Sequence, residues 1–248
     1  MHNPFSLSGK TILVTGASSG IGKSVAIECA KMGARLIITG RNRERLDETM
    51  KQLEGDNHQQ KICDLQTDEG MKIVVENVPL IDGIVHCAGI TRTVPFTYVT
   101  PEIVKEIIGI NFIAPLTISR QLLSLKKIRS NGSIVFISSI SGTLCSYIGN
   151  SIYSASKGAI NGLIKGMALD LAPKKIRVNS VTPGMVETDI LSAGSISEDQ
   201  LQEDMKRYPL KRYGRPEEIA YSVIYLLSDA ASWITGSNLL IDGGYTLL

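Results

Sequence analysis

Short runs of β-branched and other apolar residues alternate with longer helical patterns along almost the whole chain. Seven of these runs are predicted strands, at 11–15, 35–39, 60–63, 83–86, 133–138, 177–181 and 238–241. Helical patterns fill the intervals, at about 21–32, 44–53, 68–78, 101–123, 152–171, 197–207 and 216–227. Continuously apolar strands separated by helices indicate a parallel sheet with helices on both faces. The sequence therefore predicts an α/β fold with a doubly wound sheet of about seven strands.

No linker or repeat divides the 248 residues, so we expect a single domain over 1–248. Apolar residues make up 43% of the chain and charged residues 20%, which excludes wholesale disorder. The net charge of +2 gives no reason to expect a nucleic-acid or membrane partner. No stretch approaches 18 uninterrupted apolar residues, so no bilayer-spanning segment is predicted.

Cysteine usage and the amino terminus indicate the compartment. None of the four cysteines forms a CxxC pair and only three histidines are present, so we expect neither a metal site nor a disulfide framework. The first ten residues lack a basic start followed by an apolar run, so they do not resemble a secretory signal. A cytoplasmic protein with reduced thiols is the prediction.

A glycine-rich turn joins the first predicted strand to the first predicted helix. Its candidate cofactor-binding residues are Gly16, Ser18, Ser19, Gly20, Ile21 and Gly22. Glycine permits positive φ and lets a diphosphate approach the backbone, where free N–H groups and the helix dipole favour negative charge. Glycines that only ease packing are the alternative. The context of strand, turn and helix favours a Rossmann-type dinucleotide site.

The turn has the spacing Gly-x3-Gly-x-Gly, and a Tyr-Ser-Ala-Ser-Lys motif follows at 153–157. Together these motifs resemble those of the short-chain dehydrogenase/reductase family. The resemblance covers essentially the whole chain, and within the family it is closest to 3-oxoacyl-acyl-carrier-protein reductases. The residues that carry it further are Asp64, Ala88, Gly89, Asn111, Ser139, Pro183, Gly184, residues 39–42, 186–189 and 209–220, and the closing 242–244.

The residues after the second strand predict which nicotinamide cofactor binds. An NAD site usually has an acidic residue there, whereas an NADP site needs positive charge. This chain has Gly40 and then Arg41, whose guanidinium can pair with a 2′-phosphate, so NADP(H) is predicted. The alternative is that Arg41 only begins a solvated helix. The resemblance further implies that the adenine and nicotinamide ends are held by Asp64, Leu65, Ala88, Gly89, Tyr153, Lys157, Pro183, Gly184, Val186 and Thr188.

Tyr153 and Lys157 are four residues apart on one helix, so their side chains share a face. A lysine ammonium and an oxidised nicotinamide both favour the phenolate, which should lower the pKa of Tyr153 toward neutrality. Tyr153 is the expected general acid/base, and Ser139, at the end of the fifth strand, is expected to bind the substrate carbonyl. The resemblance implies that Asn111 binds a water beside Lys157. A tyrosine–lysine pair on a solvated helix surface is the alternative.

One departure from the family lies after the fourth strand. The family commonly has Asn-Asn-Ala-Gly, whereas this chain has His86, Cys87, Ala88 and Gly89. We expect His86 and Cys87 to be packed residues and not a catalytic thiol–imidazole pair.

The expected function is NADPH-dependent reduction of a small-molecule or carrier-linked ketone, most like reduction of a 3-oxoacyl thioester to a 3-hydroxyacyl product. The alternatives are an NAD(P)-dependent dehydrogenase of a sugar, polyol or steroid alcohol, and a non-catalytic cofactor-binding regulator. A lid over the substrate is expected at about 190–208, and the resemblance implies a homotetramer with 222 symmetry. The basic clusters 126–129 and 174–175 could contact an acidic carrier or be solvated loop charges.

Overall fold

The computed structural model describes residues 3–188 and 198–247, in which seven parallel strands form one sheet. The strand order is β3-β2-β1-β4-β5-β6-β7, and every pair of neighbours is parallel. The bounds are β1 Thr11–Thr15, β2 Arg35–Gly40, β3 Gln59–Ile62, β4 Ile81–His86, β5 Ile128–Ile137, β6 Arg177–Pro183 and β7 Asn238–Ile241. The predicted doubly wound sheet is confirmed.

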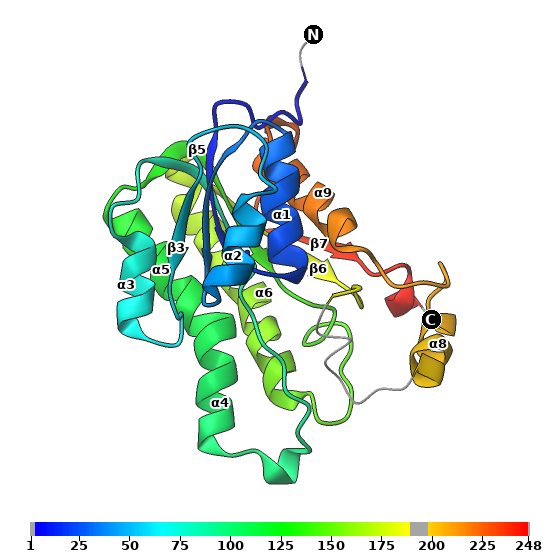
Figure 1. Cartoon of the computed structure of the whole chain (residues 1–248). Coiled ribbons are helices and arrows are strands. Elements are labelled where there is room, and N and C mark those ends of the chain that lie inside the picture. The colour runs from blue at the N-terminus through cyan, green and yellow to red at the C-terminus, as the bar shows by residue number, and fades with distance from the viewer. Residues whose placement is uncertain (1–2, 189–197, 248) are drawn as a thin grey trace.

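Helices cover both faces of this sheet (Figure 1). One layer holds α1 (Gly20–Lys31), α2 (Arg43–Met50) and α9 (Pro216–Leu227), and the other holds α3 (Asp68–Val75), α5 (Ala114–Ser124) and α6 (Ser151–Leu171). Successive side chains of β1 enter different cores, because Ile12 and Val14 pack under the first layer and Leu13 under the second. Burial on both faces explains why the strands are continuously apolar.

The sheet has its topological switch point between β1 and β4. The chain moves outward from β1 through β2 to β3, then returns to β4 on the other side of β1. Loops that follow these two strands therefore diverge and leave a crevice at the carboxyl edge, where ligands bind in open α/β sheets. The glycine-rich turn follows β1, so the fold places it at this crevice.

The predicted helix at 101–123 consists of three pieces: α4 (Pro101–Ile108), a π-helical turn (Gly109–Ile113) and α5. By length and composition alone, Pro101–Ser124 is apolar enough to cross a membrane. The core helix of a soluble protein passes the same test, and here α5 packs against α3 while α4 packs against α6.

Strand β5 begins five residues earlier than predicted. The Asn131-Gly132 pair, which precedes the predicted strand at 133–138, is an irregularity inside the observed strand, with Asn131 at φ +66°. Ile128 pairs with Ile81 before the irregularity, and Ser133 pairs with Gly83 after it.

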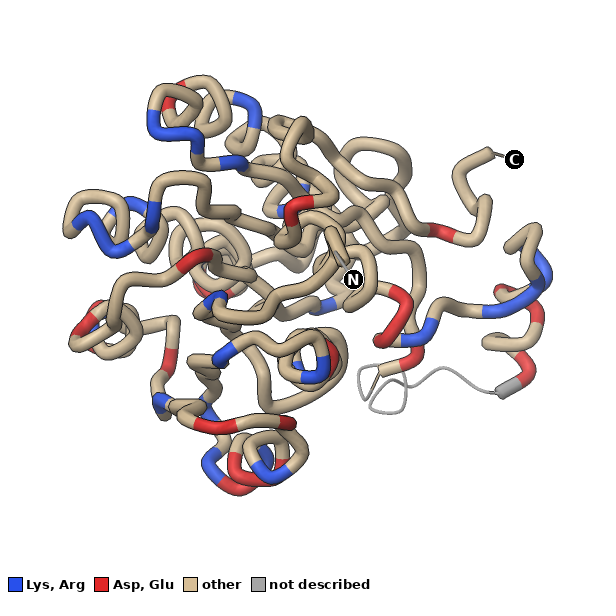
Figure 2. Tube along the Cα trace, turned by 90° about the horizontal axis from the view of Figure 1, so that it is seen from above, with Lys and Arg blue, Asp and Glu red and all other residues tan. Residues whose placement is uncertain are grey.

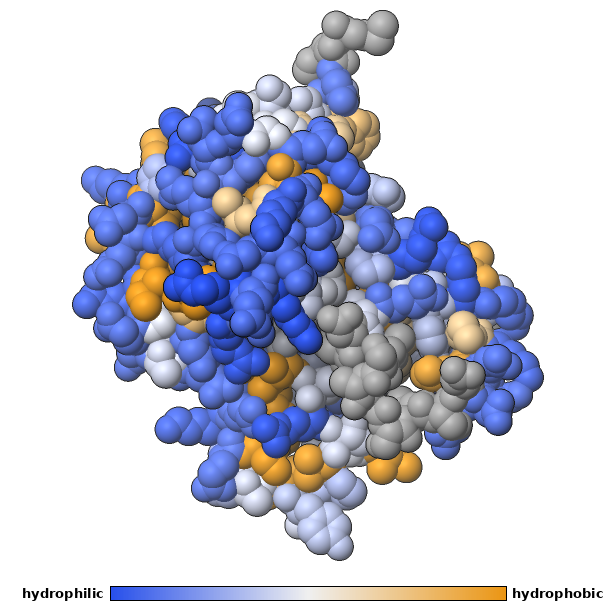
Figure 3. All heavy atoms as spheres, in the orientation of Figure 1, coloured by the Kyte–Doolittle hydropathy of each residue, from blue (hydrophilic) through white to orange (hydrophobic). Residues whose placement is uncertain are grey.

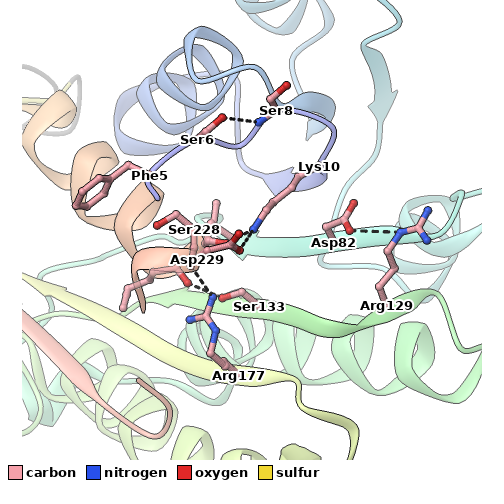
Figure 4. Close-up of polar contacts among 12 residues, drawn as sticks. Phe5, Ser6, Ser8, Lys10, Asp82, Arg129, Ser133, Arg177, Ser228 and Asp229 are labelled. Atoms are coloured by element: carbon pink, nitrogen blue, oxygen red, sulfur yellow. Dashed lines mark hydrogen bonds and ion pairs between the residues drawn. The ribbon is translucent and has the colours of Figure 1, made fainter. Parts of the chain in front are cut away.

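Side chains from distant segments cap the carboxyl end of α9, as Figure 4 shows. Three carbonyl groups there accept hydrogen bonds: Leu226 from Ser133 Oγ (2.8 Å), Leu227 from Lys10 Nζ (3.4 Å) and Ser228 from Arg177 Nη2 (3.2 Å). Two of the donors are cations, which the negative end of a helix dipole favours. This cap fastens α9 to β5, β6 and the segment before β1.

Candidate active site

The glycine-rich turn is packed too closely for side chains at two positions. Gly16 has φ +69°, and a Cβ on it would lie 2.7 Å from the backbone of Ala88. A Cβ on Gly22 would lie 2.2 Å from the carbonyl oxygen of Gly16. Glycine is therefore required for the turn to fold against both the β4 loop and the first turn of α1.

The amino end of α1 is free to meet an anion. Ser19 is the N-cap residue, but its side chain makes no capping hydrogen bond, and the first turn of the helix carries no acidic residue. Unused N–H groups and the positive end of the dipole thus face the crevice. Thr188 reaches the same turn, since its Cγ2 lies 3.2 Å from where a Gly20 Cβ would be. The donor set fits the diphosphate of a dinucleotide.

The carboxyl end of β2 lies directly beside this turn. A Cβ on Gly40 would lie 3.1 Å from the Cβ of Ser18, so the two segments touch. The exposed Arg41 follows, and within the described ranges 3–188 and 198–247 its side chain makes no ion pair or hydrogen bond. On the other side Asp64 is half-buried and accepts from Gln66 N at 3.0 Å, next to the buried Leu65. These residues fit an adenosine with a 2′-phosphate.

Ser139 and Tyr153 are brought together by contacts between the loop after β5 and helix α6. Ser139 Oγ accepts from Ser141 N at 3.1 Å, and Ser141 Oγ accepts from Asn150, the N-cap residue of α6, at 3.3 Å. The Ser139 side chain also lies close enough to Tyr153 to favour the ionised form of its hydroxyl. The expected pair is therefore adjacent, at the carboxyl edge of the sheet.

Lys157 is buried, and its Nζ donates to the carbonyl of Ile137 at 2.7 Å and lies 5.7 Å from the centre of the Tyr153 ring. Burial lowers the pKa of Lys157 to about 8. Burial also raises the pKa of Tyr153 to about 12, although the interaction with Ser139 acts in the opposite direction. The expected lowering of the tyrosine pKa is thus wrong for the chain by itself, because desolvation of the phenolate dominates.

Asn111 lies in the π-helical turn, where its buried amide is bonded entirely to other parts of the protein. Oδ1 accepts from Ile90 N at 2.8 Å, and Nδ2 donates to Ile90 O at 2.9 Å and to Ser156 Oγ at 3.0 Å. A Cβ on the neighbouring Gly89 would lie 3.3 Å from Asn111 Oδ1 and 3.5 Å from Lys157 Nζ. The side chain of Asn111 therefore fixes residues 89–90 beside Lys157.

Sequence reasoning missed Ser156, which joins Asn111 to α6. Its fully buried hydroxyl donates to the carbonyl of Tyr153 at 2.6 Å while it accepts from Asn111. The available signal was its position between Tyr153 and Lys157, on a turn whose neighbours were already candidates.

His86 and Cys87 are packed residues. The His86 ring stacks on Phe136 with centroids 4.8 Å apart, and Nε2 lies 2.8 Å from Ser119 Oγ. Burial lowers the pKa of His86 to about 3 and raises that of Cys87 to about 12. Neither group is activated for nucleophilic chemistry at neutral pH.

The segment after β6 contains the residues expected at the nicotinamide, and backbone bonds hold it on two sides. Gly184 N donates to Ile241 O at 2.9 Å, Gly214 N donates to Met185 O at 3.0 Å, and Glu187 N donates to Gly214 O at 2.8 Å. Within the described part of the chain, no hydrogen bond uses the N–H or C=O of Val186. A donor and an acceptor on one residue are thus available to a carboxamide, which needs one of each.

Most of the first half of the expected lid, residues 190–197, lies outside the described residues. The second half forms α8 (Glu198–Lys206), which stands apart from the sheet on the side of β7 (Figure 1). Tyr213 ties α8 to the body, since its hydroxyl hydrogen-bonds the carbonyl of Leu201 at 3.2 Å and Asp204 Oδ2 at 3.0 Å.

The loops that follow β4 and β5 carry large apolar side chains on the surface. The lower part of the face in Figure 3 has apolar atoms in the region where Figure 1 places α4. Phe96 is 74% exposed and Ile148 90% exposed, and the other exposed members are Tyr98, Leu144 and Tyr147. The backbone bond from Val94 N to Gly149 O, 2.8 Å, joins the two loops. We call these five side chains the apolar rim.

Within residues 3–188 and 198–247, no group of three or more His, Cys, Asp or Glu side chains could hold a metal ion. The arrangement instead offers a dinucleotide cradle beside a serine, a tyrosine and a buried lysine.

Comparison with known proteins adds relatives of full length. A family model described as enoyl-(acyl carrier protein) reductase matches residues 16–246. A 3-oxoacyl-[acyl-carrier-protein] reductase of Rickettsia felis is 35% identical over 244 residues, which cover 98% of this chain and 99% of the relative. A tropinone reductase homolog of Datura stramonium is 35% identical over 253 residues, covering 98% and 94%. A Beutenbergia cavernae protein named for NAD(P)-dependent gluconate 5-dehydrogenase activity, crystallised with NADP at low occupancy, has a TM-score of 0.88 and 32% identity over 99% of this chain and 100% of that chain.

Proposed function

The chain belongs to the short-chain dehydrogenase/reductase family of oxidoreductases, and from that membership we propose that it reduces a 3-oxoacyl thioester with NADPH. The main observation in support of this reaction is that Ser139, Tyr153 and Lys157 lie close together at the carboxyl edge of the sheet, next to the glycine-rich turn. The apolar rim favours an acyl substrate.

NADPH is supported by the donors along the crevice. Arg41 has no partner within the described residues and follows Gly40, where an NAD site would place a carboxylate. Gly16, Ser18, Ser19, Gly20, Ile21 and Gly22 would hold the diphosphate, Asp64, Leu65, Ala88 and Gly89 the adenosine side, and Pro183, Gly184, Val186 and Thr188 the nicotinamide side. When bound, the reduced cofactor supplies the hydride.

The proton comes from Tyr153. Ser139 donates a hydrogen bond to the substrate carbonyl oxygen, which orients the carbonyl and stabilises negative charge on its oxygen. The Tyr153 hydroxyl would give its proton to the carbonyl oxygen, which together with the hydride that the cofactor would supply accounts for a secondary alcohol product. A tyrosine with a raised pKa stays protonated at neutral pH, which suits the reductive direction. Lys157 supplies the neighbouring positive charge, and Asn111 fixes the backbone beside it.

The substrate class is argued from the apolar rim. An acyl chain laid on it would remove apolar surface from water, at roughly 25 cal/mol per Å². A sugar or polyol would gain little from Phe96 or Ile148. The gluconate-related structural relative makes a sugar acid the second candidate.

The basic clusters do not support carrier docking near the site. Residues 126–129 and 174–175 precede or begin β5 and β6, at the edge of the sheet opposite Tyr153. Arg129 pairs with Asp82 at 3.3 Å, and Figure 2 shows positive and negative residues interspersed around the molecule. The proposed substrate is therefore a 3-oxoacyl thioester of an acyl carrier protein or of coenzyme A.

We also propose a cytoplasmic, single-domain homotetramer with 222 symmetry. Exposed apolar side chains on α6 and around β7 support two such interfaces: Leu169 on α6, and Trp233 and Leu240 around β7. Light scattering that gave a monomer at micromolar concentration would contradict this assembly.

The experiment is a side-by-side measurement of NADPH oxidation with 3-oxoacyl thioesters on both carriers, with a keto sugar acid, and with a ketosteroid. We expect 3-oxoacyl thioesters to have the highest kcat/KM. Ile148→Asn should raise KM for a long-chain 3-oxoacyl thioester more than for the acetoacetyl one, because only the long chain covers the rim. Turnover of the sugar acid alone would replace this proposal with the second candidate.

A further inference from the structure

The hydroxyl of Tyr208 accepts a hydrogen bond from Met185 N, at a distance of 3.1 Å. Met185 immediately precedes Val186 in the segment expected at the nicotinamide, whereas Tyr208 follows α8, 23 residues further along the chain. The tyrosine is 3% exposed, so this contact lies inside the protein. A side chain from the lid region thus reaches the backbone of the cofactor segment.

The Tyr208 ring is held in place by aromatic neighbours. Tyr213 meets it edge to face with centroids 5.5 Å apart, and Tyr245 lies 4.8 Å away. Arg207 in turn lies over the Tyr245 ring, 5.0 Å from its centroid. Aromatic pairs at these separations stabilise one ring orientation, so the hydroxyl is presented at a fixed position.

The peptide groups of residues 184–187 are anchored one after another. Backbone groups hold the Gly184 N–H, the Met185 C=O and the Glu187 N–H. In a trans peptide the N–H and C=O point in opposite directions. The Met185 C=O points toward Gly214, so the Val186 N–H, which belongs to the same peptide, points away from it. The Glu187 N–H also points toward Gly214, so the Val186 C=O, which shares that peptide, points away as well.

The Met185 N–H is the exception in this series, since its partner is a side chain. It belongs to the peptide between Gly184, whose N–H donates to Ile241, and Met185, whose C=O accepts from Gly214. Without an acceptor this buried N–H would be unpaired, which favours rotation of the peptide toward another partner. That rotation would move the backbone immediately before Val186.

We propose that Tyr208 is a positioning residue, whose hydroxyl fixes the Met185 peptide so that the N–H and C=O of Val186 face the nicotinamide carboxamide. The inference rests on the proposed use of a nicotinamide cofactor. It predicts that the hydroxyl matters for the nicotinamide half of the cofactor and not for the adenosine half, which is held by the turn after β1 and by the end of β2.

Binding of two ligands to Tyr208→Phe tests this. Tyr213→Phe is the matched control, because it removes the hydroxyl of an equally buried tyrosine in the same cluster, and the partners of that hydroxyl within residues 3–188 and 198–247 lie on α8. Calorimetric titration would use NADP and 2′-phosphoadenosine 5′-diphosphoribose, which lacks the nicotinamide. We expect Tyr208→Phe to weaken NADP by about three- to tenfold, the usual effect of one hydrogen bond, and to leave the fragment unchanged. Tyr213→Phe should leave both affinities within about twofold of the wild type.

Equal weakening of both ligands by Tyr208→Phe would overturn the inference, since it would indicate a general structural role. Unchanged NADP affinity would overturn it directly. A wild-type protein that bound neither ligand would overturn the proposed cofactor and the inference with it, so the two failures are distinguishable.

Discussion

The ammonium of Lys157 lies 5.7 Å from the centre of the Tyr153 ring. Burial of this ammonium lowers its pKa to about 8, whereas the pKa of Tyr153 is about 12. Of the two groups, Lys157 is therefore the one that titrates near physiological pH. Its positive charge is present below pH 8 and lost above it.

This difference predicts the pH profile of ketone reduction. We expect kcat/KM, which reports groups of the free enzyme, to be level below about pH 8 and to fall at higher pH as Lys157 loses its proton. Initial rates of NADPH oxidation across pH 6–10 measure this. A profile that rose through pH 9 would contradict the assignment of Lys157 and of Tyr153 as the proton donor.

Arg41→Ala should separate the two nicotinamide cofactors. The variant loses the charged donor for the 2′-phosphate, so we expect kcat/KM with NADPH to fall by at least about tenfold. The value with NADH, which lacks the phosphate, should stay within about twofold. Arg43→Ala, in the exposed first turn of α2, is the control and should change neither value. A wild-type preference for NADH would refute the cofactor assignment.

His86 should make the protein sensitive to acid. The ring has a pKa of about 3 when folded and an ordinary pKa near 6.5, so between these values only the unfolded state binds the proton. Stability is therefore full above about pH 6.5 and lost as pH falls, by up to about 1.4 kcal/mol per pH unit. His86→Asn removes this titration.

Urea unfolding at pH 8 and at pH 4.5 tests the role of His86. Comparison at pH 8, where the histidine is neutral in both states, gives the packing cost of His86→Asn. The wild type should lose more stability than His86→Asn between pH 8 and pH 4.5. Parallel losses would show that another group controls acid unfolding.

Ser133→Ala should destabilise the fold through the end of α9. The substitution leaves the buried Leu226 carbonyl without its donor, which costs about 1–3 kcal/mol. Ser8→Ala, at an exposed position in the same view, should change stability by less than about 0.5 kcal/mol (Figure 4). Thermal or urea unfolding gives both values, and equal stabilities for the two variants would contradict the capping role.

The sequence predicted the sheet well because burial on both faces leaves a plain pattern of apolar runs. It failed where tertiary contacts decide local structure. The apolar pattern at 101–123 continues through Asn111 and gives no sign of the π-helical turn, in which the Asn111 amide bonds to Ile90 and Ser156. Likewise, Asn131-Gly132 has turn composition, yet pairing of Ile128 with Ile81 extends β5 beyond it.

The candidate site, like the fold, could be predicted from the sequence only in part. Motif spacing brought Ser139, Tyr153 and Lys157 together correctly, because helix and strand geometry fixes which residues share a face or an edge. The raised pKa of Tyr153 in the chain by itself depends on burial, which the sequence does not reveal. Ser156 and Tyr208 escaped notice because each acts through the backbone or amide of a distant segment.

Turnover by Tyr153→Phe tests the central claim most directly, because this substitution removes only the hydroxyl that gives the proton. With NADPH and a 3-oxoacyl thioester, we expect kcat to fall by about 10²–10⁴-fold, while the affinity for NADPH measured by titration stays near the wild-type value. Near-normal turnover in Tyr153→Phe would contradict the account.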